Sequence, residues 1–511
     1  MAPAGGKKDI LPPVLLSAIP ENNQVNFTAT KIVLTFNEYV QLKDVQKQVM
    51  ISPPMDPAPQ IELRKKSVII SFADSLKSNT TYTLNFGNSI ADFTEGNSLE
   101  GYQYVFSTGP VADSLTISGI IKDALTTKPV KDAAALLYDS FTADSLIGNS
   151  PPQYYGRTSE NGKFTIRNVR EGSYRLLGVD DKNNNFTVQI TDERAGSAKN
   201  PVEVKDSTFA EAFISLQPPL LQSVKSSTRE LPGKITTAFA KPVKNLSWKF
   251  IGMQPDKIIE EYSSYRDTVI LFCIPGVADS SRVIWFENGN AIDTTIYRPG
   301  KVKTAPNAVA PRIFAANTYP SSESILAPET LPFIKWSVPF VTFDTSAVKV
   351  YKDSLLISYK GFFTDSLKLT YALDGNWTEG KYKVVIPAGI AVDIYDRTND
   401  TIAFSFSAME ENAAGSITFN FVARNNDTKL LQLVNDKDEV VRQRPVTEKL
   451  KDIFSLITPG EYRLRLIYDT NNNGRWDGGA IAEKIFPEYV IYYNDPVTVR
   501  SNWEVELEWI E

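Results

Sequence analysis

The 511-residue sequence contains no histidine and only one cysteine. Without histidine, the chain lacks the commonest general base near neutral pH, every catalytic triad built on imidazole, and imidazole zinc sites. Cys273 has no partner for an internal disulfide, and its apolar run Val269–Ile274 predicts a core residue rather than a nucleophile. A glycosidase needs two carboxylates, but no such pair stands out. We therefore predict a non-enzymatic protein that requires no cofactor.

Basic clusters and long apolar runs are also missing. The sequence has 54 Lys and Arg against 60 Asp and Glu, which gives a formal net charge of −6. This balance argues against nucleic acid or an anionic membrane surface as a partner. No apolar run approaches the roughly 18 residues that cross a bilayer. We therefore expect any attachment to a membrane to depend on a lipid anchor.

Apolar and polar residues alternate with period two through most of the chain, between clusters of Asn, Asp, Gly, Ser and Pro. This pattern is typical of antiparallel strands with one buried face. The last such segment predicts two opposite faces, a core face with Trp503, Val505, Leu507 and Trp509, and a solvent face with Glu504, Glu506 and Glu508. The sequence thus predicts an all-β fold.

Self-comparison reveals two kinds of repeated unit. Three segments begin with an aromatic residue, Phe36, Phe239 or Trp336, that an apolar residue follows four positions later. A second unit occurs twice, at Gly172–Leu176 and Gly460–Leu464, and nine residues after each Gly an Asp opens an Asn-rich loop. We infer a tandem array of about five β-sandwich domains, each of about 100 residues.

Two of these units resemble known families. The first segment, with Ile19–Asn23, Phe36–Val40 and Phe106–Thr108, resembles the bacterial Ig-like domain of the S-layer protein type. The second, from Ile117–Asp123 to Tyr174–Leu176, resembles the carboxypeptidase-regulatory-like, transthyretin-type sandwich. The resemblance implies a surface or periplasmic scaffold, and it implies no catalytic residues.

The opening segment Met1–Pro13 is rich in small residues and Pro, which predicts a flexible spacer. Its Gly5–Pro13 stretch is similar to the run after the lipid-bearing Cys in a family of Gram-negative surface lipoproteins. That resemblance implies that Met1 stands in place of a signal peptide and a lipidated Cys. It also implies an outer-membrane lipoprotein on the cell surface or the periplasmic face. The alternative is an ordinary flexible N-terminus.

Pro- and Gly-bearing stretches mark the expected domain boundaries. The predicted domains are a tether at 1–11, an Ig-like domain at 12–109, a carboxypeptidase-regulatory-like sandwich at 113–217, a divergent Ig-like domain at 219–305, an Ig-like domain at 306–410, and a transthyretin-like sandwich with the Asn-rich loop at 413–511.

The second Asn-rich loop is a candidate calcium site. Oxygen-bearing side chains fall at positions 1, 3, 5 and 9 of an EF-hand-like loop, at Asp469, Asn471, Asn473 and Asp477. Gly474 holds the sixth position, but the twelfth is Ala480, so Glu483 would have to replace the bidentate Glu. The alternative is an Asx-rich turn, in which these side chains bond to their own backbone. The first copy, Asp181–Asn185, continues into Phe186 without Gly and is a poorer candidate.

Nine tripeptides consist of Asp, then Ser or Thr, then an apolar residue or Thr, where average usage predicts roughly two. The pattern is similar to an O-glycosylation motif that one group of Gram-negative bacteria uses on exported proteins. The candidate acceptors are Ser75, Ser114, Ser145, Ser207, Thr268, Thr294, Ser354, Ser366 and Thr401. The alternative is that Asp-Ser simply begins turns before apolar strands.

Most aromatic residues occupy alternating positions, where they are expected in cores. Trp377 and Trp476 fall in predicted turns instead, so they are candidates for contact with a glycan or a partner. Taken together, the patterns favour an outer-membrane lipoprotein scaffold that mediates protein–protein interaction as an accessory subunit of an outer-membrane complex. The alternative is a carbohydrate-binding surface lipoprotein that presents polysaccharide.

Overall fold

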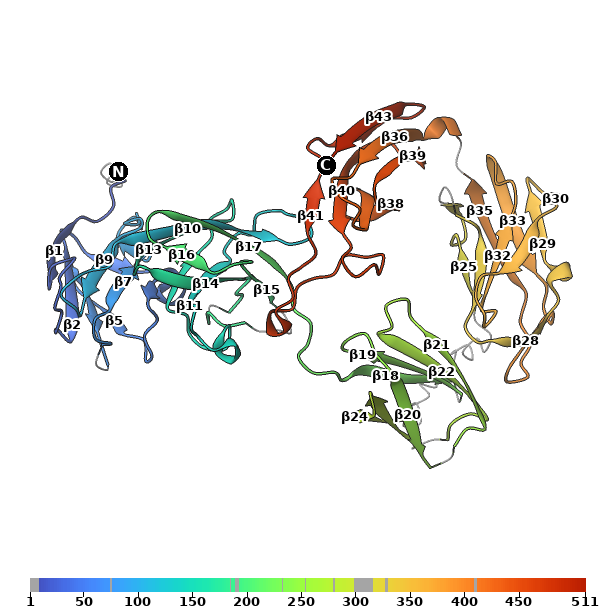
Figure 1. The fold of residues 1–511 in the computed structure, drawn as a ribbon, viewed down its shortest axis with the longest axis horizontal. Helices are drawn as coiled ribbons and strands as arrows, with labels where there is room; N and C mark the ends of the chain where they lie inside the picture. The colour runs from blue at the N-terminus through green and yellow to red at the C-terminus, as the bar shows by residue number, and fades with distance from the viewer. Residues whose placement is uncertain are drawn as a thin grey trace, which may run out of the picture. The chain divides into compact units, whose positions relative to one another are not determined.

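The fold is described from a computed structural model (Figure 1). The described residues are 9–73, 76–183, 185–188, 193–231, 233–252, 254–278, 281–297, 316–326, 330–408 and 411–511. Within these ranges the regular structure is almost entirely β-strand, and the one α-helix is α1 (Val45–Gln48). No helix in the described part is long and apolar enough to cross a membrane. The predicted all-β class, a tandem array of sandwiches, is confirmed.

The chain divides into two compact units. The N-terminal unit comprises Met1–Pro218 together with Ile467–Ile491, and the C-terminal unit comprises Pro219–Leu466 together with Tyr492–Glu511. For reference, we number the sandwiches by their strands: first (β1–β9), second (β10–β17), third (β18–β24), fourth (β25–β35) and fifth (β36–β43). The predicted domain boundaries themselves remain predictions.

One four-stranded sheet recurs in the first, third and fourth sandwiches with the same strand order. In the first sandwich it is β1 (Leu15–Ile19), β2 (Lys31–Phe36), β6 (Ser67–Ser71) and β5 (Gln60–Arg64). In the third it is β18 (Val224–Leu231), β19 (Lys234–Phe239), β22 (Thr268–Ile274) and β21 (Lys257–Tyr262). In the fourth it is β25 (Ala316–Tyr319), β27 (Phe333–Trp336), β32 (Thr370–Asp374) and β31 (Lys360–Phe363).

A second sheet completes each of these sandwiches. It contains β4 (Met50–Ser52), β7 (Thr81–Asn85) and β9 (Gln103–Ser107) in the first, and β20 (Leu246–Ile251), β23 (Arg282–Glu287) and β24 (Asn290–Ile296) in the third. In the fourth its order is β26 (Ser324–Leu326), β35 (Ile402–Ala408), β33 (Gly380–Ile386), β29 (Lys349–Lys352) and β30 (Leu355–Ile357). Short pairs β3 (Val40–Leu42) with β8 (Ile90–Asp92) and β28 (Phe340–Phe343) with β34 (Ala391–Asp393) accompany the first and fourth sandwiches.

The second and fifth sandwiches share a different topology, in which the first strand pairs in parallel with the last. These parallel pairs are β10 (Leu115–Asp123) with β17 (Thr208–Leu216), and β36 (Gly415–Val422) with β43 (Glu504–Ile510). The other strands of the second sandwich are β11 (Ala134–Asp139), β12 (Tyr154–Arg157), β13 (Lys163–Val169), β14 (Gly172–Val179), β15 (Arg194–Ser197) and β16 (Val202–Val204). Those of the fifth are β37 (Lys429–Val434), β38 (Val440–Val446), β39 (Lys449–Ile457), β40 (Gly460–Tyr468), β41 (Val490–Tyr492) and β42 (Val497–Val499). The likeness to transthyretin stays a prediction.

Each sandwich encloses its own core of aromatic and branched side chains. The aromatic residues that open the three repeats, Phe36, Phe239 and Trp336, are all buried, as their spacing predicts. Cys273 is fully buried in the core of the third sandwich, and burial raises the pKa of its thiol to about 12. A thiol with that pKa remains protonated near neutral pH. The prediction of a core cysteine is confirmed.

The last strand departs from the sequence pattern at one residue. Val505, Leu507 and Trp509 are half-buried in β43, and the three intervening glutamates are exposed, as expected. Trp503, predicted on the same core face, is instead 56% exposed. It lies in the loop before β43, where the Arg500 guanidinium sits 4.8 Å from its ring centroid. The alternation fails there because the strand begins only at Glu504.

Candidate functional site

The second Asn-rich loop brings its four predicted ligand residues together. Asp469 is buried, and its two carboxylate oxygens accept the backbone N–H groups of Asn473 at 3.0 Å and Gly474 at 2.8 Å. Asn471 donates from Nδ2 to Asp477 Oδ2 at 2.6 Å, and Asn473 Nδ2 donates to the same oxygen. The loop therefore closes on itself through side-chain oxygens, as the Asx-turn alternative predicts.

A buried carboxylate that the sequence did not indicate supports this loop. Glu488 accepts the Thr470 N–H at 2.7 Å and its hydroxyl at 3.0 Å through one oxygen, and the Asp477 N–H at 3.0 Å through the other. Burial raises the pKa of the Glu488 carboxyl. In the first loop, Glu193 accepts the Lys182 N–H at 3.2 Å in the corresponding place. Only alignment of the two loops, each from its Asp to a later Glu, could have identified this pair.

The metal prediction for this loop remains a prediction. Within the described residues, no group of three or more Cys, Asp or Glu side chains is arranged to hold a metal ion. The amides of Asn471 and Asn473 present N–H groups to Asp477, and a half-turn of each amide would present oxygens there instead. The ion pair of Arg475 Nε with Asp477 Oδ1, at 3.2 Å, would compete with any cation. Ala480, at position twelve, is buried and brings no oxygen ligand, and Glu483 lies in the 3₁₀ turn Ile481–Glu483.

The glycosylation candidates mostly lie on accessible backbone. Ser75 lies outside the described residues. Seven of the remaining eight acceptors are exposed, at Ser114, Ser145, Ser207, Thr294, Ser354, Ser366 and Thr401. Thr268 is half-buried at the start of β22, where its hydroxyl contacts Asp267 at 3.3 Å. Exposure is necessary for modification but is ordinary for such residues, so O-glycosylation stays a prediction.

Both candidate tryptophans are half-buried rather than fully exposed. The half-buried Trp377 ring meets Tyr382 and Phe406 edge-on, with centroids 5.1 and 5.5 Å apart. Trp476 is also half-buried, and its Nε1 donates to the Glu488 carbonyl at 3.0 Å. Turn position in the sequence did not reveal these contacts, because they form only when the turns are folded. Contact with a glycan or partner remains a prediction for both residues.

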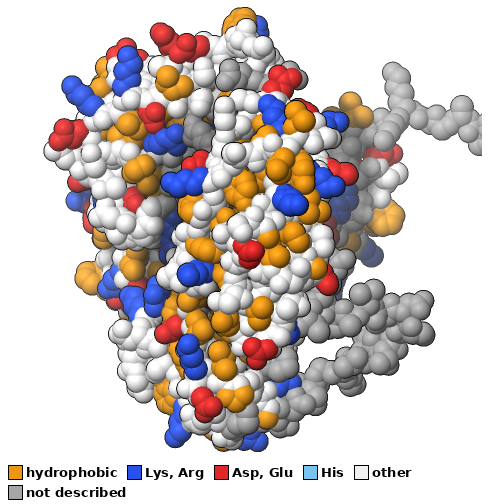
Figure 2. All heavy atoms as spheres, turned by 90° about the vertical axis from the view of Figure 1, so that its right-hand side faces the viewer, with side chains coloured by type: hydrophobic (Ala, Val, Ile, Leu, Met, Phe, Trp, Pro, Cys, Tyr) orange, Lys and Arg blue, Asp and Glu red, His pale blue; other side chains and the backbone are white. Residues whose placement is uncertain are grey.

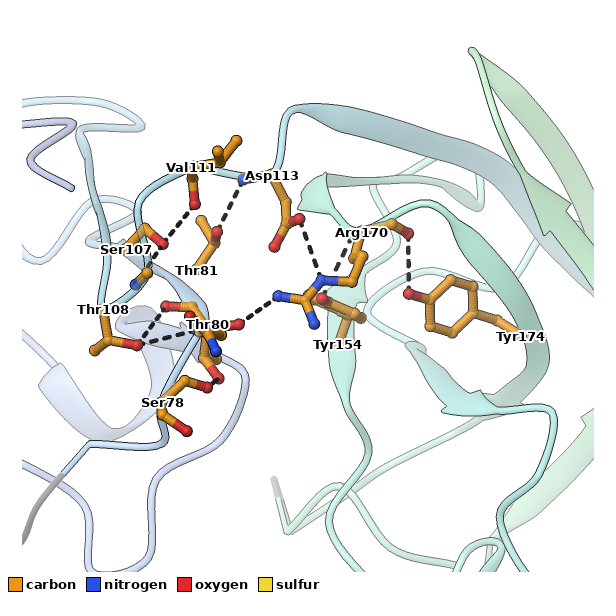
Figure 3. Close-up of polar contacts among 12 residues, drawn as sticks. Ser78, Thr80, Thr81, Ser107, Thr108, Val111, Asp113, Tyr154, Arg170 and Tyr174 are labelled. Atoms are coloured by element: carbon orange, nitrogen blue, oxygen red, sulfur yellow. Dashed lines mark hydrogen bonds and ion pairs between the residues drawn. The ribbon is translucent and has the colours of Figure 1, made fainter. Parts of the chain in front are cut away.

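Polar contacts join the first and second sandwiches within the N-terminal unit. Figure 3 shows Arg170, from the turn between β13 and β14, reaching toward the first sandwich. Its Nε lies 3.4 Å from Asp113 Oδ1, and its guanidinium donates to the Asn79 carbonyl. Tyr174 donates from its hydroxyl to the Arg170 carbonyl at 2.9 Å, which fixes the turn that carries the arginine. The short linker between the first and second sandwiches, which contains Asp113, is thus held by contacts on both sides.

A tyrosine from the second sandwich seats on strand β4 of the first. The backbone N–H of Ile51 donates to the Tyr155 hydroxyl at 2.6 Å, and the Tyr155 N–H donates to Ser52 Oγ at 3.4 Å. Asn168 adds a bond from Nδ2 to Thr83 Oγ1 at 2.8 Å. Burial raises the pKa of Tyr155 to about 12, in keeping with a hydroxyl sealed within the joint. No local pattern in the sequence indicated this contact.

The segment after the second Asn-rich loop contacts the second sandwich, also within the N-terminal unit. Gly479 N–H donates to Ser215 Oγ at 3.0 Å, and Ile481 N–H donates to Gln217 Oε1 at 2.9 Å. Lys484 pairs with Asp144 at 2.6 Å. This segment, residues 478–484, thereby acts as a clasp on the second sandwich.

Residues 9–108, which contain the first sandwich, match the family model of the bacterial Ig-like domain. No curated protein shows a significant match to the sequence. The resemblance of the first domain to bacterial Ig-like domains is confirmed, whereas the lipoprotein and transthyretin resemblances remain predictions.

Solved structures with similar folds include three of different kinds. The Bacteroides ovatus mixed-linkage glucan utilization locus protein SGBP-B, in complex with a mixed-linkage heptasaccharide, is 10% identical over 76% of this chain and 92% of its own, with a TM-score of 0.22. The S-layer protein rSbsC is 10% identical over 95% and 67%, with a TM-score of 0.16. An L,D-transpeptidase from Mycobacterium smegmatis is 11% identical over 40% and 77%, with a TM-score of 0.15. Likenesses this remote do not bear on the function of the chain.

Proposed function

We propose that the chain is a non-enzymatic scaffold, carried as a lipoprotein at the outer membrane, that binds another surface or outer-membrane protein as an accessory subunit. The observation that carries this proposal is the joint between the first two sandwiches. Tyr155, Asn168 and Arg170 bond it at separate points, and these bonds reach backbone as well as side-chain atoms.

A joint of this kind suits a protein that presents surfaces to a partner. Modules held in one arrangement lose less conformational entropy on binding than modules that swing freely, so a bonded joint favours affinity. The single cysteine, Cys273, is buried in a core, and its raised pKa keeps the thiol protonated near neutral pH. In the second Asn-rich loop, the carboxylate of Asp469 bonds to two backbone N–H groups. These features support a binding role.

The test begins with the protein expressed in its native cells with its own leader. We expect it in the outer-membrane fraction, with a mass that includes a lipid. Purification in mild detergent, followed by mass spectrometry, is expected to recover a membrane protein at constant stoichiometry. A soluble protein without lipid would overturn the lipoprotein proposal, and recovery of the chain alone would overturn the accessory-subunit proposal.

A matched pair of variants tests whether recovery of the partner depends on the joint between the first two sandwiches. Tyr155→Phe removes one hydroxyl that accepts the Ile51 N–H across the joint, while Tyr138→Phe removes a buried hydroxyl that bonds only within the second sandwich. We expect the first variant, and not the second, to weaken recovery of the partner. Equal recovery of the partner by both variants would show that partner binding does not depend on this bond across the joint.

A further inference from the structure

One side of the fourth sandwich is formed by a single continuous edge, residues 355–363. Strand β30 ends one sheet of this sandwich, and β31, which follows it directly, ends the other. Leu355 is 73% exposed and Leu356 is 65% exposed, and Phe362 is exposed further along. Lys360 is the only charged residue in the edge, which contains no Pro. An edge strand of this kind presents backbone N–H and C=O groups that can pair with another strand.

The surface around this edge is apolar and lysine-bearing. Figure 2 looks onto the right-hand side of Figure 1, where β29, β30 and β33 lie. It shows hydrophobic side chains gathered in a band, with Lys and Arg side chains beside it and Asp and Glu side chains among them. Lys381 and Lys383 alternate with buried residues along β33, so they project from the outer face of the sheet. Lys349 does the same on β29, and Lys360 is exposed in β31.

Two carboxylates that flank the edge in sequence are engaged in local turns, and Asp374 lies directly opposite Lys360 in the register of β31 with β32. Asp353 Oδ1 accepts the backbone N–H of Lys381 at 3.1 Å. Asp365 accepts the N–H groups of Leu369 and Thr370 at 2.9 and 2.7 Å. Beside the edge, Lys349, Lys381 and Lys383 present exposed positive charge on β29 and β33, which complements an acidic segment.

The equivalent edges of the first and third sandwiches are protected. Between β4 and β5 the connection 53–59 contains four prolines, and β5 carries Glu62 and Arg64. Between β20 and β21 stands Pro255, and three of the six residues of β21 are charged. Prolines and charges are common devices that keep edge strands from pairing. In the fourth sandwich the corresponding connection forms the apolar strand β30 instead.

In the first sandwich, the corresponding side contacts a strand of another sandwich. Its strand β4 occupies the place of β29 in the sheet order, and there Ile51 N–H bonds to the Tyr155 hydroxyl of β12. The corresponding side of the fourth sandwich carries β30, whose described pairing is with β29 alone.

We propose that the edge 355–363 of the fourth sandwich binds an extended, acidic segment of a partner protein, which adds as a further strand beside β30 and β31. This proposal rests on the scaffold function and names the surface that performs it. Backbone hydrogen bonds hold the added strand, Leu356 and Phe362 pack against its apolar side chains, and the lysines attract its carboxylates. The affinity falls as salt rises, because the lysines are exposed and screened.

The experiment uses the full chain and defined probes. The first probe is an acetylated peptide of nine residues in which Glu and Val alternate, and its matched control alternates Lys and Val. We expect the acidic peptide to bind at least tenfold more tightly by calorimetry at low salt, and to slow hydrogen exchange selectively in residues 355–363. Equal binding of both peptides, or protection elsewhere without protection at 355–363, would overturn the proposal.

A pair of variants locates the binding. Leu356→Lys places a charge on β30 of the apolar edge, and Leu63→Lys does so at a 40% exposed position on β5, the counterpart of β31 in the first sandwich. Since both side chains are exposed, we expect both variants to melt as the unmodified chain does. Leu356→Lys is expected to weaken peptide binding at least tenfold, and Leu63→Lys to leave it unchanged. The opposite pattern, or no effect of either variant, would contradict the assignment.

Three further outcomes separate this proposal from its alternatives. If the unmodified chain self-associates with concentration in sedimentation and Leu356→Lys abolishes this, the occupant is a second copy, and the acidic partner is ruled out. If the Leu356→Lys variant still recovers its membrane partner from detergent extracts at full stoichiometry, the docking edge fails while the scaffold function stands. If the unmodified chain recovers no partner yet binds the acidic peptide at 355–363, the accessory-subunit function fails while the edge is upheld.

Discussion

The two Asn-rich loops share one sequence pattern but distribute their charges differently. In the first loop the opening Asp181 is buried and paired with the Arg157 guanidinium at 3.1 Å. In the second loop the opening Asp469 is equally buried, and in both loops the opening Asp accepts two backbone N–H groups. The arginine of the second loop, Arg475, pairs instead with the closing Asp477. The two loops therefore share the backbone bonds of the buried aspartate and differ in which carboxylate pairs with an arginine.

The backbone of the two loops differs in a related way. Gly474 adopts a left-handed φ of 77°, which costs glycine little. Phe186, near the corresponding point of the first loop, also has a left-handed φ, 56°, which is costly for a side chain of its size. Its ring packs on Tyr155, with centroids 4.0 Å apart, and lies under Arg157. The first loop thus couples its aspartate to the sandwich joint, whereas the second remains a self-contained oxygen-rich turn.

The largest expected effect comes from a substitution that breaks the buried ion pair of the first loop. Asp181→Ala leaves the Arg157 guanidinium, whose side chain is largely buried, without its carboxylate, at a cost of about 3 kcal/mol. Asp469→Ala removes acceptors for two backbone N–H groups and is expected to cost about 1–3 kcal/mol. The measurement is local hydrogen exchange in each loop of the full chain. A greater loss for Asp469→Ala would reverse the comparison.

The next prediction compares the effect of calcium on the two loops. If the second loop binds the ion, calcium at a hundred times its dissociation constant should stabilise residues 467–491 by about 2.7 kcal/mol, with no effect at residues 181–188. Asp477→Ala should abolish the effect, and Asp181→Asn should preserve it. Melting with and without a chelator, supported by calorimetry, provides the measurement. No change on chelation would establish the loop as an Asx turn.

The pH dependence of the second loop follows from Glu488. Because burial raises the pKa of this carboxyl in the folded state, the folded state binds its proton more tightly than the unfolded state does. The resulting stabilisation is fully present below the unfolded pKa near 4.5 and is lost as pH rises through the raised folded value. We expect Glu488→Gln to remove this dependence, as followed by exchange in residues 467–491 after correction for intrinsic rates. Persistence of the dependence in the variant would assign it to another group.

The smallest effect concerns Trp476. Trp476→Phe keeps a ring but removes the bond from Nε1 to the Glu488 carbonyl, which should cost about 1 kcal/mol in the stability of the loop. If this ring also stacks on a sugar, Trp476→Ala should abolish oligosaccharide binding on a glycan array, whereas Trp476→Phe should retain part of it. Absence of binding by the unmodified chain would weaken the carbohydrate alternative.

Sequence patterns predicted the modules better than the contacts between them. The buried aromatics Phe36, Phe239 and Trp336 were found because a core repeats with the strand period, which a sequence displays directly. The bond between Ile51 and Tyr155 links positions 104 residues apart, and it depends on the shapes of two finished surfaces. Glu488 was missed for a similar reason, since a carboxylate is buried only where folded loops supply N–H donors. Trp503 was misplaced because the pattern does not mark where a strand begins.

The clasp has a consequence for how the protein is made. Its residues 478–484 complete a unit whose other part ends at Pro218, so the missing piece leaves the ribosome roughly 250 residues later. At usual synthesis rates this is a wait of roughly 10–50 s, during which Ser215, Gln217 and Asp144 lack their partners from the clasp. Chains that terminate early would carry this surface uncovered for good. The clasp therefore distinguishes chains that extend past residue 484 from chains that stop before it, and proteases that cleave exposed segments would meet the difference there.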